Sequence, residues 1–310
     1  MNETLFISIC IPAFQRPDNL KRLLDSIEMQ NFRSFEVVLT DDSPGEELRG
    51  LVENHPLKPK IRYFKNQKTL GSPENWNEAI RKTLADWIKI MHDDDWFSGP
   101  DSLRSFAEAI EGGKSDFYFS AFTRVLPDGR SERIRLRSSR LEALNRFPEL
   151  LLAANRIGPP SVVIFKKDPS ILFDHRMQWL VDIDFYIRFL KNHPSSGYLS
   201  RPLVQIGISE SQVTQSSFGK QEIEIPERFL LAEKLEGAVN RNIHIYDSWW
   251  RFLRNLSVRD SGQIASAGYN GKIPPFITDM IKSQNKIPAT LLRWGPSSKF
   301  FMFLNYLQNA

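Results

Sequence analysis

The sequence has little of what disulfide-linked, zinc-binding or membrane-spanning proteins need. Cys10 is the only cysteine among 310 residues, which excludes an internal disulfide and a disulfide-dense secreted scaffold. The five histidines show no zinc-site spacing, and no stretch approaches the roughly 20 apolar residues that cross a bilayer. Glu3 stands where a signal peptide carries a cation, and the apolar run over residues 5–11 is short for one. We therefore expect a cytoplasmic protein, with peripheral attachment at the inner face of the membrane as an alternative.

Two common phosphate-binding fingerprints are also absent. The sequence contains neither Gly-x-Gly-x-x-Gly nor Gly-x-x-x-x-Gly-Lys-[Ser/Thr], which removes the usual dinucleotide-binding and P-loop sites. Charge of one sign does not dominate, because 41 Lys and Arg stand against 37 Asp and Glu, for a net charge of +4. This balance favours anionic partners only weakly, and no nucleic-acid partner is expected.

Short apolar runs alternate with helical patterns over the first 120 residues or so. Such alternation predicts βαβ units on a mostly parallel sheet. The expected strands are residues 5–11, 35–39, 61–64, 87–91 and 116–121. The expected helices are 17–30, one that follows the turn at 40–44 and ends at about 53, 73–84 and 101–111.

Polar clusters follow three of these strands, at residues 12–17, 40–43 and 92–96. Ligands of parallel sheets bind beyond the carboxyl ends of the strands, so the clusters should lie along one edge. Asp93, Asp94 and Asp95 are costly together without a counter-charge. A hard divalent cation such as Mg²⁺ or Mn²⁺, which also bridges phosphate oxygens, would resolve this. The alternative is a solvated acidic turn before the helix that begins near Asp101.

The secondary-structure signals in the rest of the chain are weaker. A basic, polar segment over residues 125–140 is interpreted as a solvated loop, with a grip on a phosphorylated acceptor as the alternative. A helix over 141–153, a strand over 161–165 and a helix from near Asp182 follow, and the chain beyond 222 is helical and aromatic. Residues 281–310 hold four cations and no acid, for which core packing is preferred over a membrane surface or a homodimer contact. The arginines of the basic segment are Arg130, Arg133, Arg135, Arg137 and Arg140.

In their order and spacing, four motifs resemble the inverting family 2 glycosyltransferases. They are Ile9–Arg16 followed by a helix, Val37–Ser43, Thr69-Leu70-Gly71 with Asn75 and Asn77, and His92–Trp96. The resemblance covers residues 5–122 well and continues more loosely to about 215. It implies an α/β GT-A fold, that is, a Rossmann-like, mostly parallel sheet flanked by helices. The expected division is a nucleotide-sugar-binding half (1–122), an acceptor-binding half (123–220) and a helical C-terminal extension (221–310).

The resemblance also implies roles for individual residues. Asp42, or its neighbour Asp41, would hydrogen-bond the base, most often uracil, and Asp93 would approach the ribose or sugar. Asp94 would be the main ligand of Mn²⁺ or Mg²⁺, with His92 and Asp95 beside it. His92 departs from the commonest family pattern, which has an aspartate there, although imidazole also binds manganese. The nucleotide pocket would be lined by Pro12, Phe14, Arg16 and Asn75.

On the acceptor side, Val181–Arg188 resembles the segment that carries the family's catalytic base, which corresponds to Asp182. The alternative is that Asp182 or Asp184 caps a helix, and Arg188 is expected to be a structural ion-pair partner. The turn Gly158–Ser161 would border the acceptor cleft. The loop Ser209–Thr214 would close over the donor through Gln212 and Thr214, unless it is a plain polar loop.

The function expected from these motifs is a metal-dependent inverting hexosyltransferase. It would move a sugar from a UDP-linked donor to the hydroxyl of a saccharide or lipid-linked saccharide, as in bacterial surface polysaccharide synthesis. One alternative, suggested by His92, is a catalytically silent sugar-nucleotide-binding protein of the same fold. A nucleotidyltransferase ranks lower, because residues 12–17 offer no glycine-rich, lysine-bearing phosphate loop.

Overall fold

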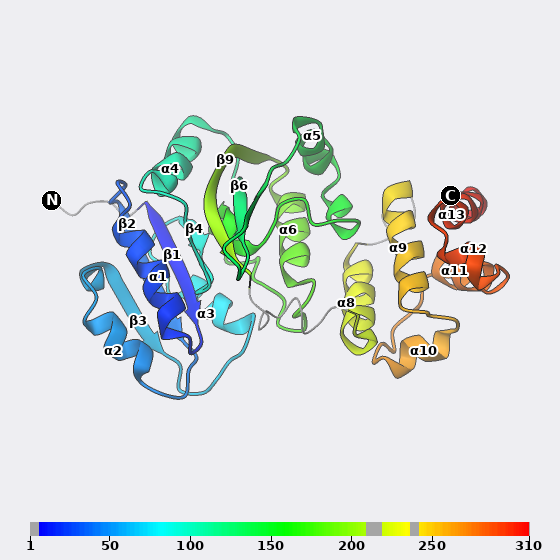
Figure 1. The fold of residues 1–310 in the computed structure, drawn as a ribbon, viewed down its shortest axis with the longest axis horizontal. Helices are drawn as coiled ribbons and strands as arrows, with labels where there is room; N and C mark the ends of the chain where they lie inside the picture. The colour runs from blue at the N-terminus through cyan, green and yellow to red at the C-terminus, as the bar shows by residue number, and fades with distance from the viewer. Residues whose placement is uncertain (1–5, 209–218, 236–241, 310) are drawn as a thin grey trace. The chain divides into compact units, whose positions relative to one another are not determined.

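The computed structural model describes residues 6–208, 219–235 and 242–309, which fall into two compact units (Figure 1). The first, here called the sheet unit, contains the described residues of Met1–Arg146, Arg156–His175 and Asp184–Gln212. The second, the helical unit, contains those of Phe147–Asn155, Arg176–Ile183 and Val213–Ala310.

The sheet unit is built on a nine-stranded sheet of order β3-β2-β1-β4-β8-β6-β9-β5, with β7 beside β6. All pairs among the first four strands are parallel, as the sequence predicts, whereas β8 runs antiparallel to both of its neighbours. Further along, β6 and β9 pair in parallel, and β5 and β7 are antiparallel to β9 and β6. The strands are β1 (Ile7–Ala13), β2 (Phe35–Asp41), β3 (Ile61–Lys65), β4 (Trp87–Ile90), β5 (Asp95–Phe97), β6 (Phe117–Val125), β7 (Ser131–Ile134), β8 (Val163–Lys166) and β9 (Ser196–Gly207).

Strands β1 and β2 are buried along their whole length, because helices cover both faces of the sheet (Figure 1). Helix α1 buries Leu20, Leu23, Leu24 and Ile27, whose spacing puts them on one stripe, and Pro17 begins it at a position that needs no N–H donor. Helix α3 packs on β1 and β2, and α4 packs on β9. The helices of this unit are α1 (Pro17–Glu28), α2 (Glu47–Glu53), α3 (Glu74–Arg81), α4 (Ser102–Gly112) and α5 (Ser138–Arg146), with short 3₁₀ turns η1 (Lys58–Lys60) and η3 (Pro160–Val162).

The predicted helix over residues 141–153 is only partly correct, because the structure has two separate elements there. Helix α5 ends at Arg146, and a separate 3₁₀ turn, η2 (Pro148–Leu152), follows it. The break lies at Phe147, whose φ of −141° and ψ of 75° are not helical, because a residue before proline is disfavoured in the helical region.

The segment interpreted as a solvated loop, residues 125–140, is partly a hairpin. Residues 131–134 form β7 against β6, and α5 begins at Ser138. The five arginines from Arg130 to Arg140 are nevertheless exposed, as the interpretation expected.

The helical unit confirms the prediction that the chain beyond residue 222 is helical. Its core is aromatic, with Tyr246, Trp249 and Trp250 buried on α9. The preference for packing is wrong for Trp294, Phe300 and Phe303, which are exposed. The helices are α8 (Gln221–Lys234), α9 (Ile243–Asn255), α10 (Ser261–Ser266), α11 (Pro275–Asn285), α12 (Ala289–Arg293) and α13 (Gly295–Asn309). Helix α6 (Val181–Asn192) contributes its first three residues to this unit and the rest to the sheet unit.

A buried carboxylate on α8 organises the segment before α6. Glu227 Oε1 accepts a hydrogen bond from the Gln178 N–H at 2.8 Å, and Oε2 accepts from the N–H groups of Trp179 and Leu180 at 2.8 and 2.7 Å. The anion thus lies just ahead of the N-terminus of α6, where a helix favours negative charge. Leu180, the residue just before α6, is thereby held by a residue 47 positions later in the chain.

Within the described ranges, every helix is too short or too polar to cross a lipid bilayer.

Candidate active site

The turn after β1 brings an arginine to the carboxyl edge of the sheet. Gln15 and Arg16 both adopt left-handed backbone conformations, with φ of 54° and 58°. The Gln15 N–H donates to Ser43 Oγ at 2.7 Å, which ties this turn to the end of β2. Left-handed non-glycine residues cost about 1–2 kcal/mol each and tend to occur where function needs a particular side-chain direction. Here the turn aims Arg16 at the end of β4, while Pro12 is buried and Phe14 is 44% exposed.

Asp41 ends β2 and Asp42 follows it, but each carboxylate already has partners inside the protein. Asp41 accepts hydrogen bonds from Tyr63 Oη at 2.5 Å, Lys65 Nζ at 3.0 Å and the Ser43 N–H at 2.8 Å. Asp42 Oδ2 accepts the N–H groups of Leu70 and Gly71 at 3.0 and 2.7 Å. The two side chains are almost fully buried. Their hydrogen bonds hold the residues after β2 and the turn over residues 66–71 in place beside the carboxyl edge of the sheet.

Asn75, on α3, links the carboxyl ends of β1 and β2 through its side-chain amide. Its Nδ2 donates to the Thr40 carbonyl at 3.2 Å and to the Ala13 carbonyl at 3.4 Å, and its Oδ1 accepts from Asn66 Nδ2 at 2.9 Å. The Asn75 N–H donates to the carbonyl of Gly71, whose φ of 74° suits glycine. Asn75 is 5% exposed and therefore holds the turn in place from within the protein.

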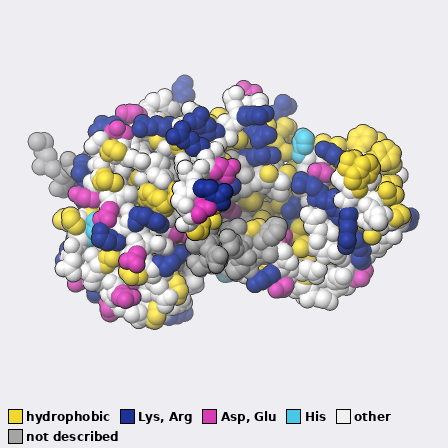
Figure 2. Space-filling model, in the orientation of Figure 1, with side chains coloured by type: hydrophobic (Ala, Val, Ile, Leu, Met, Phe, Trp, Pro, Cys, Tyr) yellow, Lys and Arg dark blue, Asp and Glu magenta, His cyan; other side chains and the backbone are white. Residues whose placement is uncertain are grey.

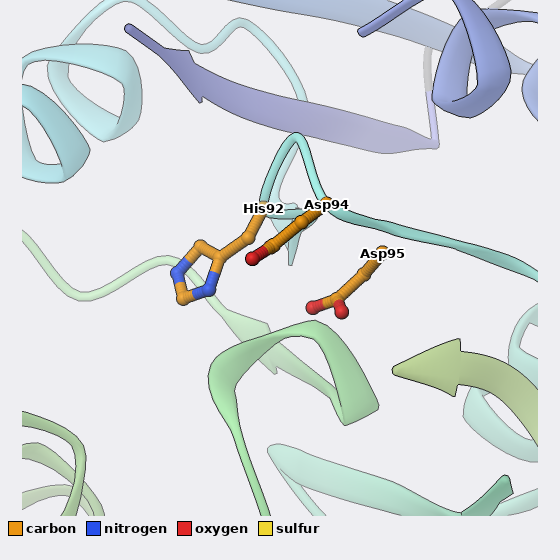
Figure 3. Close-up of side chains that lie close together, drawn as sticks. All are labelled: His92, Asp94 and Asp95. Atoms are coloured by element: carbon orange, nitrogen blue, oxygen red, sulfur yellow. The ribbon is translucent and has the colours of Figure 1, made fainter. Parts of the chain in front are cut away.

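Three side chains after β4 are close enough to share a cation. Ligand atoms of His92, Asp94 and Asp95 all lie within 4.8 Å of one another, and Figure 3 shows the three gathered beside the loop. His92 Nε2 is buried and has no hydrogen-bond partner, and its ring packs on Trp76 with centroids 4.6 Å apart. One imidazole nitrogen and two carboxylates are a donor set that suits Mn²⁺ or Mg²⁺.

Burial shifts the pKa values of three side chains in this cluster toward their neutral forms. Burial lowers the pKa of His92 to about 4, so that the ring is neutral near pH 7 and able to bind a metal. Burial raises the pKa of Asp93 to about 7, although Arg16 opposes the shift. Burial, reinforced by Asp94, raises the pKa of Asp95 well above its usual range. A bound cation would favour the charged form of both carboxylates.

Two arginines hold the acidic loop from the side of the first helix. Arg16 Nη2 lies 2.5 Å from Asp93 Oδ1, and Arg16 Nη1 lies 3.5 Å from Asp94 Oδ2. Arg22 on α1 donates to the Asp94 carbonyl at 3.0 Å and stacks over Trp96, 3.8 Å from its ring centroid. The second oxygen of Asp93, Oδ2, is buried without a hydrogen-bond partner. A ligand that donates a hydrogen bond to Asp93 Oδ2 would supply the missing partner.

The sequence-based predictions assigned the turn ending at Ser161 to the acceptor cleft, and they gave neither Ser161 nor Lys89 a contact with the acidic loop. Ser161 is fully buried, and its Oγ accepts the His92 N–H at 2.9 Å. Lys89 is fully buried in β4 and donates to the Ser161 carbonyl, so an amino group lies beneath the acidic loop. Burial lowers the pKa of Lys89 to about 7, while the charge of Asp95 opposes this shift. A lysine inside the apolar run Trp87–Met91 is the signal that could have identified it.

Gly207, at the end of β9, is packed against the same loop. A Cβ there would lie 2.5 Å from the Asp94 carbonyl oxygen, a backbone atom that cannot rotate away. We predict that Gly207→Ala costs about 1–3 kcal/mol of unfolding free energy through overpacking. It should also abolish any rise in melting temperature caused by Mn²⁺, because the loop must shift. Thermal denaturation with and without Mn²⁺ measures both effects.

Gly112→Ala is the matched control, because a Cβ at the end of α4 meets no atom within 4 Å. Alanine is the better helix former, so this variant should melt at the same temperature as the wild type or slightly above it. Equal melting temperatures and equal Mn²⁺ responses for the two variants would show that Gly207 does not fix the loop.

Asp182 is a hydrogen-bonded carboxylate whose pKa is raised above its ordinary value. Its Oδ2 accepts from Asn155 Nδ2 at 2.8 Å and its Oδ1 accepts the Ile183 N–H at 2.8 Å. Burial raises its pKa to about 6. Helix α6 begins at Val181, so Asp182 lies in the first turn rather than at the capping position.

Asp184 and Arg188 are bound to each other. Arg188 Nη2 lies 2.6 Å from Asp184 Oδ2 and also donates to the Leu172 carbonyl at 2.7 Å. Asp184 is fully buried. The prediction that Arg188 is a structural ion-pair partner is confirmed, and Asp184 is its partner. Gln212 and Thr214 lie outside the described residues.

The sheet order and the acidic loop at its carboxyl edge place this chain among α/β proteins of the GT-A type. The sequence model of Glycosyl transferase family 2 matches residues 8–172. This match covers more than half of the chain, which therefore belongs to that family.

Curated relatives match over part of their length. The chain is 28% identical over 199 residues to the uncharacterized protein MT1568 of Mycobacterium tuberculosis, covering 59% of this chain and 61% of the relative. It is 26% identical over 203 residues to an uncharacterized glycosyltransferase of Haemophilus influenzae, covering 64% and 66%. It is 27% identical over 186 residues to the succinoglycan biosynthesis protein ExoO of Rhizobium meliloti, covering 60% and 49%. The chain thus spans under two thirds of the length of these relatives.

Solved structures support the fold over nearly the whole chain. Residues 1–349 of Staphylococcus aureus TarS, in complex with UDP-GlcNAc, superpose with a TM-score of 0.62 at 19% identity, covering 98% of this chain and 92% of that one. The mannosyltransferase PcManGT of Pyrobaculum calidifontis, in complex with GDP-Man and Mn²⁺, gives a TM-score of 0.54 at 14% identity, covering 99% and 88%. These likenesses establish the GT-A fold.

Proposed function

We propose that this protein transfers a sugar from a nucleoside diphosphate sugar, UDP-linked, to an acceptor hydroxyl with inversion at the anomeric carbon. The observation that carries the proposal is the acidic loop after β4, where His92, Asp94 and Asp95 converge next to Asp93 and Arg16. This arrangement lies where ligands of parallel sheets bind, in a chain whose family is glycosyltransferase family 2.

The donor nucleotide would lie along the edge formed by the ends of β1, β2 and β4. Phe14 offers an exposed aromatic face to the base, and Arg16 offers a guanidinium to the ribose or phosphates. Asp41 and Asp42 already accept several hydrogen bonds, so they would present the base with a rigid, polar floor. Pro12 and Asn75 support that floor from within. Asp93, through its unpartnered Oδ2, would accept a hydroxyl of the ribose or the sugar.

A divalent cation fits His92, Asp94 and Asp95, because two carboxylates and a neutral imidazole nitrogen meet there. When bound, such a cation stabilises the negative charge of a departing diphosphate as a Lewis acid. The protein's part is to hold these three ligands together through Ser161 and Arg22, which bind the backbone on either side of the loop.

On the acceptor side, Asp182 would take the proton of the attacking hydroxyl. Its raised pKa of about 6 leaves it ionised yet reasonably basic near neutral pH, which is what general-base catalysis requires. The acceptor would be a saccharide or lipid-linked saccharide of the kind that surface polysaccharide synthesis uses. Support for that role comes from the name of the relative ExoO, a succinoglycan biosynthesis protein.

A ligand screen by thermal denaturation tests the donor. UDP, GDP, dTDP and ADP are added in turn with Mn²⁺, Mg²⁺ or EDTA, because a ligand that binds only the native state raises the melting temperature. We expect UDP with Mn²⁺ or Mg²⁺ to give the largest rise, corresponding to about 2.7 kcal/mol at a hundred times its dissociation constant. A larger response to another nucleotide would overturn the assignment of uridine, and no response to any would overturn the nucleotide site.

His92 favours one second candidate, a sugar-nucleotide-binding protein that performs no transfer. The imidazole stands where the family most often has an aspartate, which lowers the negative charge available to a cation. Calorimetry combined with an assay for released UDP separates the two proposals. Tight binding of a UDP-sugar without transfer or hydrolysis, over a panel of donors, would favour the silent protein.

A further inference from the structure

Helix α13 buries a largely polar side and exposes an apolar side, whereas a surface helix usually does the opposite. Its fully buried side chains are Ser298, Met302 and Asn305, two of which are polar. The buried polar atoms have partners: Trp250 Nε1 donates to Ser298 Oγ at 3.1 Å, and Tyr246 Oη donates to Asn305 Oδ1 at 2.7 Å. The core therefore anchors this helix through hydrogen bonds.

The opposite side of the same helix is apolar and exposed. At 100° per residue, Phe300, Phe303, Leu304 and Leu307 lie across the axis from Ser298, Met302 and Asn305. Phe300 is 57% exposed and Leu307 is 59% exposed, and Trp294, just before the helix, is 62% exposed. We call this set, together with Leu291 of α12, the apolar face. Figure 2 shows hydrophobic side chains gathered over the C-terminal helices. Such a contiguous exposed surface usually marks something that covers it.

The charges around the apolar face have one sign. Asp279 is the last acidic residue of the sequence, and it pairs with Lys282 at 3.9 Å. Lys286, Arg293 and Lys299 follow, all exposed, and none of them forms an ion pair with another described residue. Lys299 and Arg293 immediately flank Phe300 and Trp294 in the sequence. Their long side chains can reach lipid phosphates while the rings insert below them.

From these features we propose that the apolar face docks on the surface of an anionic lipid bilayer. Trp294 and the phenylalanines would lie at the level of the headgroups and upper acyl chains, as aromatic side chains do at membrane interfaces. Lys286, Arg293 and Lys299 would bind the negatively charged headgroups. The proposal concerns where the protein is held and does not depend on the chemistry proposed for the acidic loop.

A second copy of the chain fits the apolar face less well than a bilayer does. In a twofold contact the same surface meets itself, so Arg293 and Lys299 would lie near their own counterparts. The sequence after Asp279 offers no carboxylate side chain to neutralise them. An anionic bilayer supplies both an apolar phase for the aromatic side chains and negative charge for Arg293 and Lys299. The positive charges around the apolar face therefore favour a bilayer over a second copy of the chain.

Vesicle flotation of the full chain tests the proposal. The probes are vesicles of phosphatidylcholine alone and vesicles that also contain phosphatidylglycerol. The wild type should float with the anionic vesicles and at least about tenfold more weakly with the neutral ones, and added salt should weaken the binding. Because each cation near an anionic surface contributes about fivefold, Arg293→Gln with Lys299→Gln should weaken binding about thirtyfold. The triple variant Phe300→Ser, Phe303→Ser, Leu307→Ser should lose flotation altogether.

Met29→Ser with Leu84→Ser is the matched control, since it removes exposed apolar side chains (59% and 65%) from the sheet unit. It should float like the wild type. Unchanged circular dichroism and melting temperature of the triple variant exclude unfolding as the cause of its loss. Light scattering tests the alternative that a second copy of the chain covers the apolar face. The proposal would be overturned if the wild type is a dimer, the triple variant is a monomer, and neither floats with the vesicles. A monomeric wild type that does not float would also overturn it.

Discussion

Asp94→Asn should lower the rate of sugar transfer by about a thousandfold while leaving the protein folded. The substitution keeps the shape of the side chain but removes the negative charge that Asp94 would offer to a cation beside His92 and Asp95. Losing charge stabilisation of a leaving group costs about 10²–10³ in rate at comparable sites, and loss of a metal ligand belongs at the upper end. The measurement is release of UDP from a UDP-sugar in the presence of acceptor, with Mn²⁺ titrated over a wide range.

The titration separates weaker metal binding from lost chemistry. Activity that returns at high Mn²⁺ would assign Asp94 to metal affinity, as proposed. Asp86→Asn is the matched control, because Asp86 is an exposed aspartate just before β4, and it should behave like the wild type. Full activity of Asp94→Asn at every Mn²⁺ concentration, or of the wild type in EDTA, would contradict the metal site.

Asp182→Asn should lower the turnover number by about 10²–10⁴-fold, the range that general-base catalysis contributes. The base works only when ionised, so wild-type turnover should fall as the pH drops through about 6, the pKa to which burial raises this carboxyl. The residual activity of the variant should lose that acid limb. Turnover measured between about pH 5 and pH 8 with a saturating donor shows both effects. An acid limb that persists unchanged in the variant would assign it to another group.

The stability of the same variant distinguishes a base from a structural residue. Between the ordinary carboxyl pKa near 4 and about 6, native Asp182 keeps a proton that the unfolded chain has lost. This group therefore makes the free energy of unfolding fall as the pH rises across that window. Asp182→Asn removes the decline, so at pH 7 the variant should be as stable as the wild type or more so. Urea denaturation at both ends of the window measures this, and a marked loss of stability at pH 7 would indicate a structural role.

The parallel half of the sheet could be predicted because its signals are local. Each strand from β1 to β4 is a short apolar run, and helical patterns separate these runs. The rule that ligands lie at the carboxyl ends of strands then grouped the residues after β1, β2 and β4. The structure does bring Arg16 to Asp93 and Asp94. What these residues do for a ligand stays a prediction.

The rest depended on contacts that the local sequence does not encode. Strand β5 has three residues and exists only because β9 pairs with it. The role of Ser161 comes from bonds to residues about 70 positions earlier in the chain. On α13, hydrophobicity alone predicts that Phe300 is buried and Ser298 is exposed, whereas Phe300 is exposed and Ser298 is buried with a hydrogen bond from Trp250.

Glu227 limits how far this enzyme family member can be shortened. The last described strand ends at Gly207, so a chain truncated just after it would keep every element of the sheet. It would nevertheless lack α8 and the carboxylate that gathers the N–H groups of residues 178–180 immediately ahead of Asp182. Three donors in a low-dielectric setting would lose their acceptor at once, and the start of α6 would unravel. A fragment that keeps the surroundings of Asp182 therefore has to extend past α8.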